Sequence, residues 1–272
     1  MKLSNSISAS NESQFFLIAG PCVIESEEQV LKTARELKDI TDRHDTDLIF
    51  KSSFDKANRS SISSYRGPGI ERGLEILQRV KDEYDLPVIT DFHVPEQAAR
   101  VADVVDALQV PAFLSRQTDM LTAAGETGLP INVKKGQFLA ADGMDNVVNK
   151  IESTRNERVM LCERGAMFGY NNLVVDMRNL DIMKELGKPV VFDTTHSVQR
   201  PGAQGDSSGG DRRFAPTLAR AALGAGVAGI FAEVHPDPSS AQCDAATQLP
   251  LDDFESHVER WKAIDETVKH GK

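Results

Sequence analysis

FFLIAGPC, residues 15–22, is the stretch that decides the fold class of this 272-residue chain. It is a short apolar run that ends in Gly-Pro-Cys, and apolar residues recur at helical spacing in the segment 26–40 that follows it. A doubly wound open sheet should carry a Gly-rich phosphate fingerprint after its first strand, and AGPC is no such fingerprint. The stretch therefore favours a different arrangement of parallel strands.

Seven further runs of the same kind follow, each bounded by Pro, Gly or Asp, and amphipathic segments such as 70–84 and 252–270 separate or follow them. Eight buried strands that alternate with helices, without a linker between two halves, predict a single (β/α)8 TIM barrel. We expect residues 1–14 to form a flexible N-terminal segment and 15–272 to form the barrel domain. The seven runs are DLIFKSSF (47–54), PVITDFH (87–93), ALQVPAF (107–113), PINVKKG (130–136), VMLCERG (159–165), PVVFDTTH (189–196) and GIFAEVHP (229–236).

The composition excludes several classes of protein. The chain has 31 Lys and Arg against 41 Asp and Glu, and this net charge of −10 disfavours nucleic acid or an anionic membrane as a partner. No hydrophobic segment of a secretory signal precedes residue 15, and the most apolar stretch, 221–232, is shorter than the roughly 20 residues of a membrane span. Three cysteines make no disulfide framework, and Cys162 inside the sixth run is expected in the core. We expect a soluble, cytoplasmic protein.

Polar and ionisable residues gather where the eight predicted strands end. The catalytic groups of barrel enzymes lie at these ends, whereas the strands of this chain begin on apolar residues, Pro or Gly. The sequence therefore predicts a charged pocket at one mouth of the barrel. In chain order the residues are Cys22, Lys51, Lys56, Asp91, His93, Arg116, Gln117, Lys134, Gln137, Glu163, Arg164, Asp193, His196, Glu233 and His235.

Four of the mouth residues form a candidate metal site. Cys22, His196 and Glu233 end the first, seventh and eighth strands, which are neighbours in a closed barrel, and Asp244 follows in the next loop. A thiolate, an imidazole and two carboxylates suit a divalent ion such as Zn²⁺, Fe²⁺ or Mn²⁺. Taken alone, a cysteine at a strand end is more often a small buried hydrophobe. Cys243, beside Asp244, is a rival ligand that the chemistry leaves open.

The predicted mouth also carries six cationic side chains. Lysine and arginine are unfavourable inside a barrel unless a negative charge neutralises them. They predict one or two substrates with several negative charges, most simply phosphates and a carboxylate, and internal ion pairs with Asp91, Glu163 and Asp193 are the alternative. The six residues are Lys51, Lys56, Arg59, Arg116, Lys134 and Arg164.

Two loops are candidates for substrate contacts. In KANRSS (56–61), Arg59 offers a planar fork for a phosphate, and Ser60 can complete the cradle with nearby backbone N–H groups, although an ordinary polar loop fits too. The segment RPGAQGDSSGGDRR (200–213) is longer than most connections of a barrel. It is a candidate lid that excludes water from the site, or else a surface loop.

Several strings of the sequence resemble one known family. The strings are AGPCVIES (19–26), FKSSFDKANRSS (50–61), PAFLSRQTD (111–119), NVKKGQF (132–138), ERGAMFGYNNLVVDMR (163–178), DTTHSVQ (193–199) and QCDAATQLPL (242–251). From about residue 15 to the final helix the chain resembles the 3-deoxy-D-manno-octulosonate 8-phosphate synthases. This resemblance implies a TIM barrel, usually a homotetramer, which condenses phosphoenolpyruvate with arabinose 5-phosphate on the route to the Kdo sugar of lipopolysaccharide.

The resemblance also implies roles for single residues. The family includes metal-dependent enzymes with Cys in the first-strand motif and metal-independent ones with Asn there, and this chain has Cys22. Cys22, His196, Glu233 and Asp244 are therefore expected to hold a divalent metal ion, which favours Asp244 over Cys243.

The two substrates are assigned to two groups of residues on the same ground. Arg59 is expected to hold the far phosphate of the sugar, and Arg116 and Gln117 lie in a stretch near a subunit boundary of the family. The residues matching the phosphoenolpyruvate set are Lys51, Lys56, Lys134, Gln137 and Arg164, and those matching the arabinose 5-phosphate segment are Asn58, Arg59 and Ser60. Catalytic roles are expected for Lys56, Asn58, His196 and Asp244.

Two rival functions remain at this stage. A 3-deoxy-D-arabino-heptulosonate 7-phosphate synthase would share the barrel, phosphoenolpyruvate and a similar metal site, but it acts on erythrose 4-phosphate. That family typically has a Lys-Pro-Arg-Thr type segment where this chain has KANRSS (56–61). A non-catalytic barrel that senses a phosphosugar is the other rival, and the set of four metal ligands argues against it because a sensor needs no metal.

Overall fold

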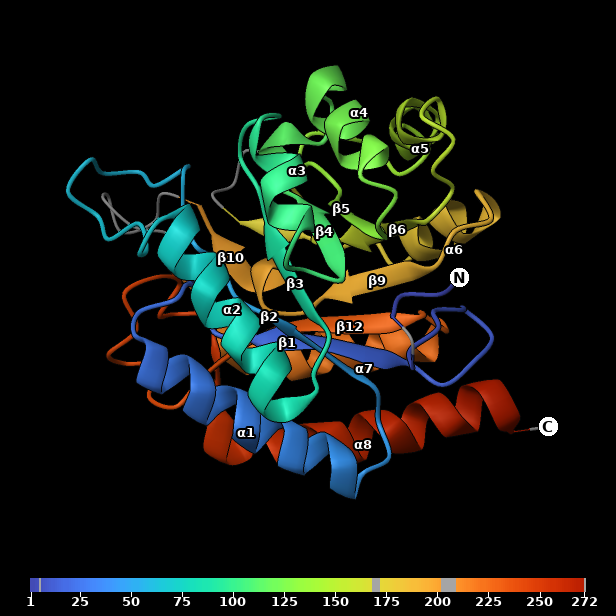
Figure 1. Ribbon diagram of the computed structural model, residues 1–272. Coiled ribbons are helices and arrows are strands. Elements are labelled where there is room, and N and C mark those ends of the chain that lie inside the picture. Colours follow the sequence, from blue (N-terminus) through green and yellow to red (C-terminus); the bar gives the residue numbers. More distant parts are fainter. Residues whose placement is uncertain (5, 168–171, 202–208, 272) are drawn as a thin grey trace.

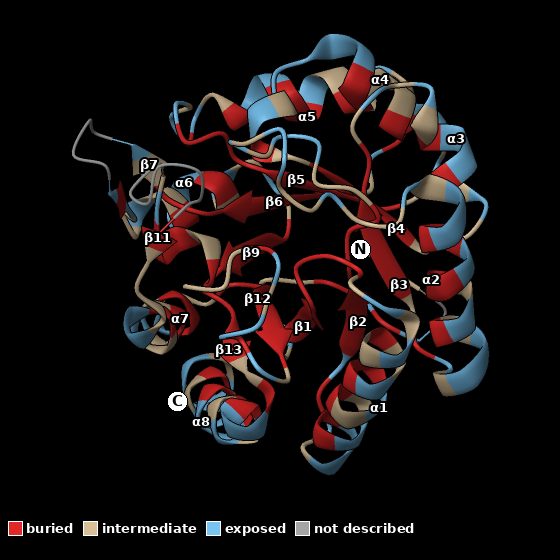
Figure 2. Cartoon of the chain, turned by 90° about the vertical axis from the view of Figure 1, so that its left-hand side faces the viewer, coloured by how far each residue is buried: buried red, intermediate tan, exposed pale blue. Residues whose placement is uncertain are grey.

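Eight parallel strands close into a barrel in the computed structural model, which describes residues 1–4, 6–167, 172–201 and 209–271. Each strand pairs with the next along the chain, and the last pairs back with the first, Phe16 opposite Gly229. Figure 2 looks roughly along the barrel and shows the buried strands surrounded by helices. The barrel strands are β1 (Phe16–Gly20), β2 (Leu48–Lys51), β3 (Val88–Asp91), β4 (Ala107–Val110), β5 (Ile131–Lys134), β6 (Val159–Glu163), β9 (Val190–Asp193) and β12 (Gly229–His235).

The helices form the outer layer, with buried faces toward the strands and exposed faces outward (Figures 1 and 2). Each of the eight predicted runs contains one barrel strand, so the predicted (β/α)8 fold is confirmed. The helices are α1 (Glu27–Arg43), α2 (Ile70–Tyr84), α3 (Gln97–Ala102), α4 (Thr118–Glu126), α5 (Met144–Glu152), α6 (Arg178–Glu185), α7 (Ala215–Gly224) and α8 (Leu251–His270). Short elements complete the chain: β7 (Ala166–Met167), β8 (Leu173–Val174), β10 (Gln199–Arg200), β11 (Gly209–Gly210), β13 (Leu249–Pro250), and the 3₁₀ turns η1 (Ala112–Leu114), η2 (His196–Val198) and η3 (Arg212–Phe214).

The first helix shows why the pattern of the sequence gives this layer. The hydroxyl of Ser26 accepts a hydrogen bond from the backbone N–H of Gln29 at 3.2 Å and so caps α1. Val30, Ala34 and Leu37, spaced at three and four residues, are fully buried against the barrel. The helix therefore begins and packs as its sequence predicts.

The N-terminal segment differs from its prediction. Leu3, Ile7 and Ala9 are buried in a cluster with the barrel residue Phe16, and the terminal amino group of Met1 donates to the carbonyl of Ala9 at 2.7 Å. In Figure 1 the N-terminus lies at the end of the barrel away from the loop that follows β2. The described part of this segment is thus packed rather than flexible, because its apolar side chains cover the N-terminal mouth of the barrel.

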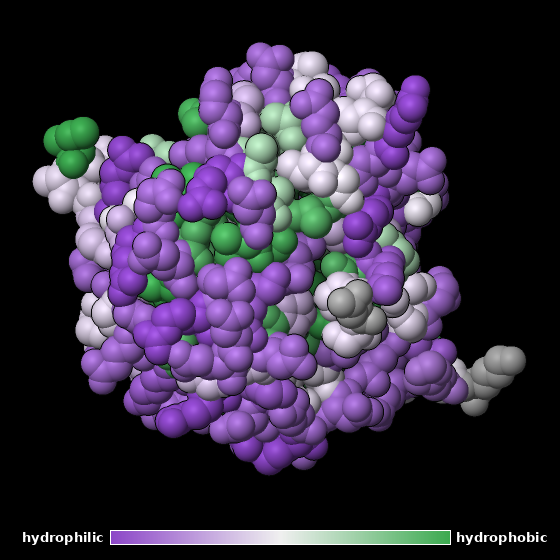
Figure 3. Space-filling model, viewed as in Figure 1, coloured by the Kyte–Doolittle hydropathy of each residue, from purple (hydrophilic) through white to green (hydrophobic). Residues whose placement is uncertain are grey.

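The surface and the cysteines agree with the composition. Within the described ranges, no helix combines the length and the apolar character needed to cross a membrane. The face drawn in Figure 3 is mostly hydrophilic, with apolar surface gathered near its middle. All three cysteines are free thiols, and Cys162 is fully buried in the core, where burial raises its pKa to about 12.

Candidate active site

A cavity of about 410 Å³ opens at the mouth formed by the carboxyl ends of the strands. Its size lies in the range of small-molecule sites. Ten residues that the sequence assigned to metal or substrate line it: Lys51, Lys56, Asn58, Arg59, Ser60, Lys134, Gln137, Arg164, His196 and Asp244. The structure therefore brings most of the predicted site together.

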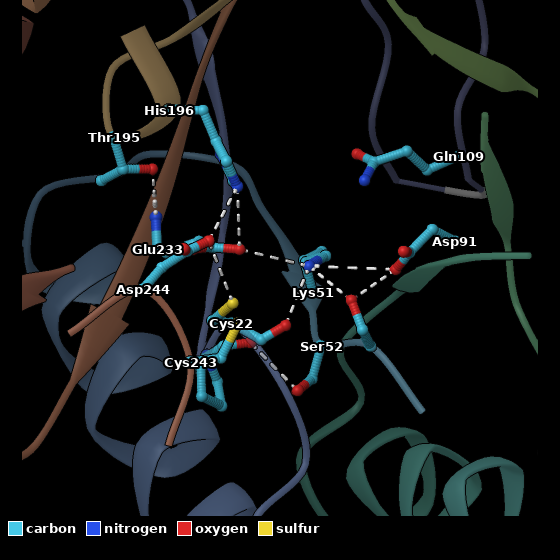
Figure 4. A network of polar contacts seen from close by, with 12 residues as sticks. Cys22, Lys51, Ser52, Asp91, Gln109, Thr195, His196, Glu233, Cys243 and Asp244 are labelled. Atoms are coloured by element: carbon cyan, nitrogen blue, oxygen red, sulfur yellow. Dashed lines mark hydrogen bonds and ion pairs between the residues drawn. The ribbon is translucent and has the colours of Figure 1, made fainter. Parts of the chain in front are cut away.

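The four predicted metal ligands meet at the edge of this cavity where β12, β1 and β9 are neighbours (Figure 4). His196 Nε2 lies 3.5 Å from Glu233 Oε1 and 3.6 Å from Asp244 Oδ2. Cys22 Sγ lies 3.6 Å from the same oxygen of Asp244. Residues that are far apart in the chain thus place a sulfur atom and a ring nitrogen around the carboxylate of Asp244, which belongs both to the group of His196 and Glu233 and to that of Cys22 and Cys243.

The burial and the ionisation of Glu233 are consistent with a cation bound beside it. Its side chain is fully buried, and within the described part of the chain neither carboxylate oxygen has a hydrogen-bond partner. Burial works to raise its pKa, but His196, Lys56 and Lys51 lower it to about 2, so the group is ionised at neutral pH. A buried carboxylate without hydrogen bonds is costly, and the donor set around it is one that a divalent ion accepts.

Cys243 lies beside this donor set, as the rival interpretation required. A sulfur or carboxylate atom of each of Cys22, Cys243 and Asp244 lies within 4.8 Å of the others. Arg59 Nη1 donates to Cys243 Sγ at 2.9 Å, however, so this sulfur already has a cationic partner. The sulfur of Cys22 contacts a carboxylate of the donor set instead. This difference favours Cys22 as the ligand.

Burial and neighbouring charges tune the protonation of the site. Burial raises the pKa of Cys22 well above its usual value, so the thiol is protonated at neutral pH. Burial works to lower the pKa of Lys56, but nearby acidic groups, Glu233 among them, outweigh it and raise that pKa well above its usual value. Lys56 is therefore a fixed positive charge at the wall of the cavity.

Asp193 orients His196. Asp193 Oδ2 lies 2.9 Å from His196 Nδ1, and Asp193 Oδ1 accepts the backbone N–H of His196 at 2.9 Å. Asp193 also accepts a hydrogen bond from Lys134 Nζ. The contact at Nδ1 leaves Nε2 to face Glu233 and Asp244.

The predicted internal ion pairs form in part. Lys134 pairs with Asp193, and Lys51 Nζ lies 3.9 Å from Asp91 Oδ1. Glu163 pairs with Lys135 at 3.5 Å, which leaves its neighbour in the chain, Arg164, for the cavity.

Arg164 contacts Gln199, which was not among the predicted site residues. Arg164 Nη2 donates to Gln199 Oε1 at 2.7 Å, whereas its buried Nη1 has no hydrogen-bond partner among the residues that the structure describes. Gln199 lines the cavity, and its place six residues after Asp193 in the string DTTHSVQ was the only hint in the sequence. The pair presents a free guanidinium N–H to the cavity.

The predicted placement of Arg116 and Gln117 in this mouth is wrong. Both side chains are exposed at the start of α4 and do not line the cavity of their own chain. β4 ends at Val110, and the turn η1 directly after it places residues 111–114 at the cavity wall instead. The chain has already left the mouth when it reaches the two predicted residues.

Half of the candidate lid lies outside the described residues, which exclude 202–208. Its described ends form a small antiparallel pair, in which Gln199 lies opposite Gly210 and Arg200 opposite Gly209. Pro201 lines the cavity. The loop thus starts and returns beside the site.

Known proteins similar to this chain agree on one family. The model of the DAHP synthetase I family matches residues 1–270. A protein of Desulfatibacillum aliphaticivorans is 55% identical over 262 residues, with 96% of each chain covered. Relatives from Albidiferax ferrireducens (57% identical, 93% of this chain and 91% of the relative covered) and Geobacter sulfurreducens (54%, 97% of each) bear the same name, 2-dehydro-3-deoxyphosphooctonate aldolase.

These matches extend over nearly the whole chain. The chain therefore belongs to the DAHP synthetase I family and, within it, to the 2-dehydro-3-deoxyphosphooctonate aldolases, the enzymes also called 3-deoxy-D-manno-octulosonate 8-phosphate synthases.

Proposed function

We propose that this protein condenses phosphoenolpyruvate with D-arabinose 5-phosphate and water to give 3-deoxy-D-manno-octulosonate 8-phosphate and inorganic phosphate, a step toward the Kdo sugar of lipopolysaccharide. The observation that carries this proposal is that a cationic group and a metal-type donor set share one cavity in a chain whose relatives have this aldolase name. The relatives' name supports arabinose 5-phosphate over erythrose 4-phosphate as the second substrate.

Phosphoenolpyruvate has a phosphate and a carboxylate, and the deep part of the cavity suits both. Lys51, Lys134 and Arg164 are nearly buried there, and the free N–H at Arg164 Nη1 needs an acceptor. Charge-assisted hydrogen bonds from these groups would hold the anion, because they are stronger than neutral ones. Lys56, a fixed positive charge at the wall, offsets the repulsion between two anionic substrates.

The sugar phosphate suits the rim of the cavity. Asn58, Arg59 and Ser60 lie in the loop between β2 and α2 and line the outer part. Arg59 Nε is buried, has no hydrogen-bond partner in the described ranges and can donate to a phosphate oxygen. We expect one end of the sugar phosphate to bind here while its aldehyde points inward.

The reaction joins C3 of phosphoenolpyruvate to the aldehyde carbon of the sugar. Water adds to C2, and the bond between C2 and the phosphate oxygen breaks, which releases phosphate. C3 is a weak nucleophile, so the main task of the residues is to hold two anions in contact, which can supply roughly 7–11 kcal/mol. A closed cavity that admits a single water molecule at C2 would keep other water away from the phosphorus atom.

We propose further that Cys22, His196, Glu233 and Asp244 hold a divalent metal ion. The buried carboxylate of Glu233 without hydrogen bonds and the mixed sulfur, nitrogen and oxygen donors support this assignment. When bound, such an ion would polarise an oxygen of the substrate or of a water molecule, which is worth several kcal/mol. Asp193 serves the site by keeping Nε2 of His196 turned toward the donors.

The assembly and location of the enzyme belong to the same proposal. A homotetramer in the cytoplasm is what the family resemblance implies, and the exposed side chains of Arg116, Gln117 and Phe113 at the turn after β4 are available to a neighbouring subunit. Light scattering on the purified protein measures the assembly, and a monomeric mass at working concentration would contradict it.

Phosphate release with two substrates tests the proposed function. We expect release that requires phosphoenolpyruvate and arabinose 5-phosphate together, with erythrose 4-phosphate giving a far lower kcat/KM. Preference for erythrose 4-phosphate would assign the chain to the heptulosonate branch of the family. If neither sugar led to phosphate release, a non-catalytic barrel that senses a phosphosugar would remain as the function.

A further inference from the structure

We propose that Gln248 is a positioning residue, whose side-chain amide holds the separate segments carrying the metal ligands in register. This inference deepens the proposed function and rests on its metal site. Gln248 was not among the predicted site residues and does not line the cavity. It lies in the loop between β12 and α8 and is fully buried.

Both ends of the amide bond to segments that carry a ligand. Gln248 Oε1 accepts the backbone N–H of Cys22 at 3.2 Å. Gln248 Nε2 donates to the backbone carbonyl of Cys243 at 2.8 Å, directly before Asp244 in the chain. One side chain thus ties the end of β1 to the loop that follows β12.

The backbone of Gln248 and that of its neighbour Leu249 each add one further tie. Its N–H donates to the carbonyl of Asp244 at 3.2 Å. The next residue, Leu249, pairs with Val234 of β12, adjacent to Glu233. Gln248 therefore contacts or adjoins the segments that carry Cys22, Asp244 and Glu233, and through these contacts it holds all three in position.

Asp244 needs such support because its backbone adopts an unfavourable conformation. It has a φ of 48°, in the left-handed region that side-chain-bearing residues rarely adopt. A conformation of this kind persists only where the surroundings enforce it. The bonds of Gln248 to the carbonyls of Cys243 and of Asp244 itself supply that constraint, and they fix the direction in which the carboxylate of Asp244 leaves the backbone.

The orientation of the amide is fixed by its partners. A flipped amide would place Nε2 against the N–H of Cys22 and Oε1 against the carbonyl of Cys243, so both bonds would be lost. An apolar side chain of similar size would fill the space but would leave two buried backbone groups without these partners. Only a residue with an acceptor and a donor at this reach keeps both segments in place.

The test is the binding of Co²⁺ by Gln248→Met, which keeps the volume and removes both bonds. Cobalt bound by a thiolate absorbs in the near ultraviolet, so the spectrum reports on Cys22 independently of activity. Asn156→Leu is the matched control: Asn156 is buried, donates to the carbonyls of Gly125 and Leu129, and lies just before β6, at the opposite end of the barrel.

We expect Gln248→Met to bind Co²⁺ about 10–100-fold more weakly than the wild type and to lose much of the thiolate absorption. Asn156→Leu should bind Co²⁺ as the wild type does, even where it lowers the melting temperature as much. Gln248→Asn, which keeps a polar amide but shortens its reach, should show the same loss of affinity and serves where Gln248→Met does not fold.

The outcomes separate this proposal from the metal site itself. A wild-type protein without thiolate absorption in the presence of Co²⁺ would refute the metal site, and this proposal with it. Wild-type absorption and affinity in a folded Gln248 variant would refute the role of Gln248 alone. Equal losses in the Gln248 and Asn156 variants would show a general effect of destabilisation and would also overturn the proposal.

Discussion

Arg59 links the two parts of the cavity. One of its guanidinium nitrogens contacts the sulfur of Cys243, another donates to the carbonyl of Gln242 at 3.3 Å, and its Nε is free. The loop that is proposed to bind the sugar phosphate is thereby fastened to the loop that carries Asp244. A substitution at this position should therefore act on the sugar more than on phosphoenolpyruvate.

We expect Arg59→Ala to raise the KM for arabinose 5-phosphate at least tenfold and to change the KM for phosphoenolpyruvate much less, because a charge-assisted bond to phosphate contributes roughly 1.5–3 kcal/mol. Steady-state kinetics with each substrate varied in turn measures this. Arg66→Ala is the control, since Arg66 lies in the same loop but pairs with Asp55 at the surface. Equal changes in both KM values for Arg59→Ala would give the residue a different role.

The two neighbouring cysteines make a second matched pair. Cys22→Ser should lower the affinity for a divalent metal ion at least tenfold, because it replaces the proposed thiolate ligand, whereas Cys243→Ser should keep it. Equilibrium dialysis followed by metal analysis measures both variants. The reverse result would make Cys243 the ligand.

Asp91 gives a dependence of stability on pH. Burial works to raise its pKa, but Lys51 and His93 hold it well below its usual value. A carboxyl group with a lowered pKa in the folded state stabilises the protein above its ordinary pKa of about 3.9, and this contribution is lost as the pH falls below that value.

The free energy of unfolding of the wild type should therefore exceed that of Asp91→Asn by about 3 kcal/mol near pH 7, the size of a broken buried ion pair, and the difference should shrink below about pH 4. Urea unfolding at a series of pH values measures it. A difference that stays constant down to pH 3 would show that Asp91 does not act through its charge.

At the scale of elements, the contact between the ends of β1 and β2 sets the spacing of the site. A Cβ at Gly20 would overlap the backbone carbonyl of Lys51, so only glycine allows this approach. Cys22 follows two residues later, and Lys51 Nζ donates to its carbonyl at 3.2 Å. The close packing of two strands thus places a metal ligand next to a substrate lysine.

Gly20→Ala should destabilise the protein by about 1–3 kcal/mol, as overpacking does, and should lower kcat because both neighbouring residues shift. Gly224→Ala is the control at the end of α7, where a Cβ would meet no atom within 4 Å. Thermal unfolding and phosphate release measure the two variants. An unchanged kcat in Gly20→Ala would show that the spacing of β1 and β2 is not critical.

Periodicity and polar strand ends were sufficient to predict the barrel and most of the site. Parallel strands bring their carboxyl ends together, so Lys134 and His196 could be placed in one mouth from their positions in the runs. The direction of the chain after a strand could not be predicted in this way. The turn η1 leads Arg116 and Gln117 out of the mouth, and no spacing in the sequence marks such a turn.

Tertiary contacts of isolated residues could likewise not be predicted from the sequence. Leu3 and Ile7 lie in a polar segment too short for a periodic pattern, yet both are buried at the far mouth of the barrel. Gln248 is an ordinary loop residue until its amide is seen between two backbone segments. Both depend on what the closed barrel places next to them.

For the whole molecule, the distribution of charge separates the inside from the outside. The chain has a net charge of −10, but Lys51, Lys56, Lys134 and Arg164 line the cavity. Glu233, Asp193 and Asp91 neutralise part of that charge, and the remainder is available to two anionic substrates. The closed barrel is what makes this possible, because it directs eight strand ends to one mouth while the helices surround the strands.

Phosphate release by metal-free and reloaded protein tests the central claim most directly. The donor set and the cationic cavity are proposed to act together on phosphoenolpyruvate and arabinose 5-phosphate. We predict that protein stripped with a chelator releases no phosphate from this pair, and that equimolar Mn²⁺ or Zn²⁺ restores release. Full activity in protein shown by metal analysis to hold no metal would contradict the account.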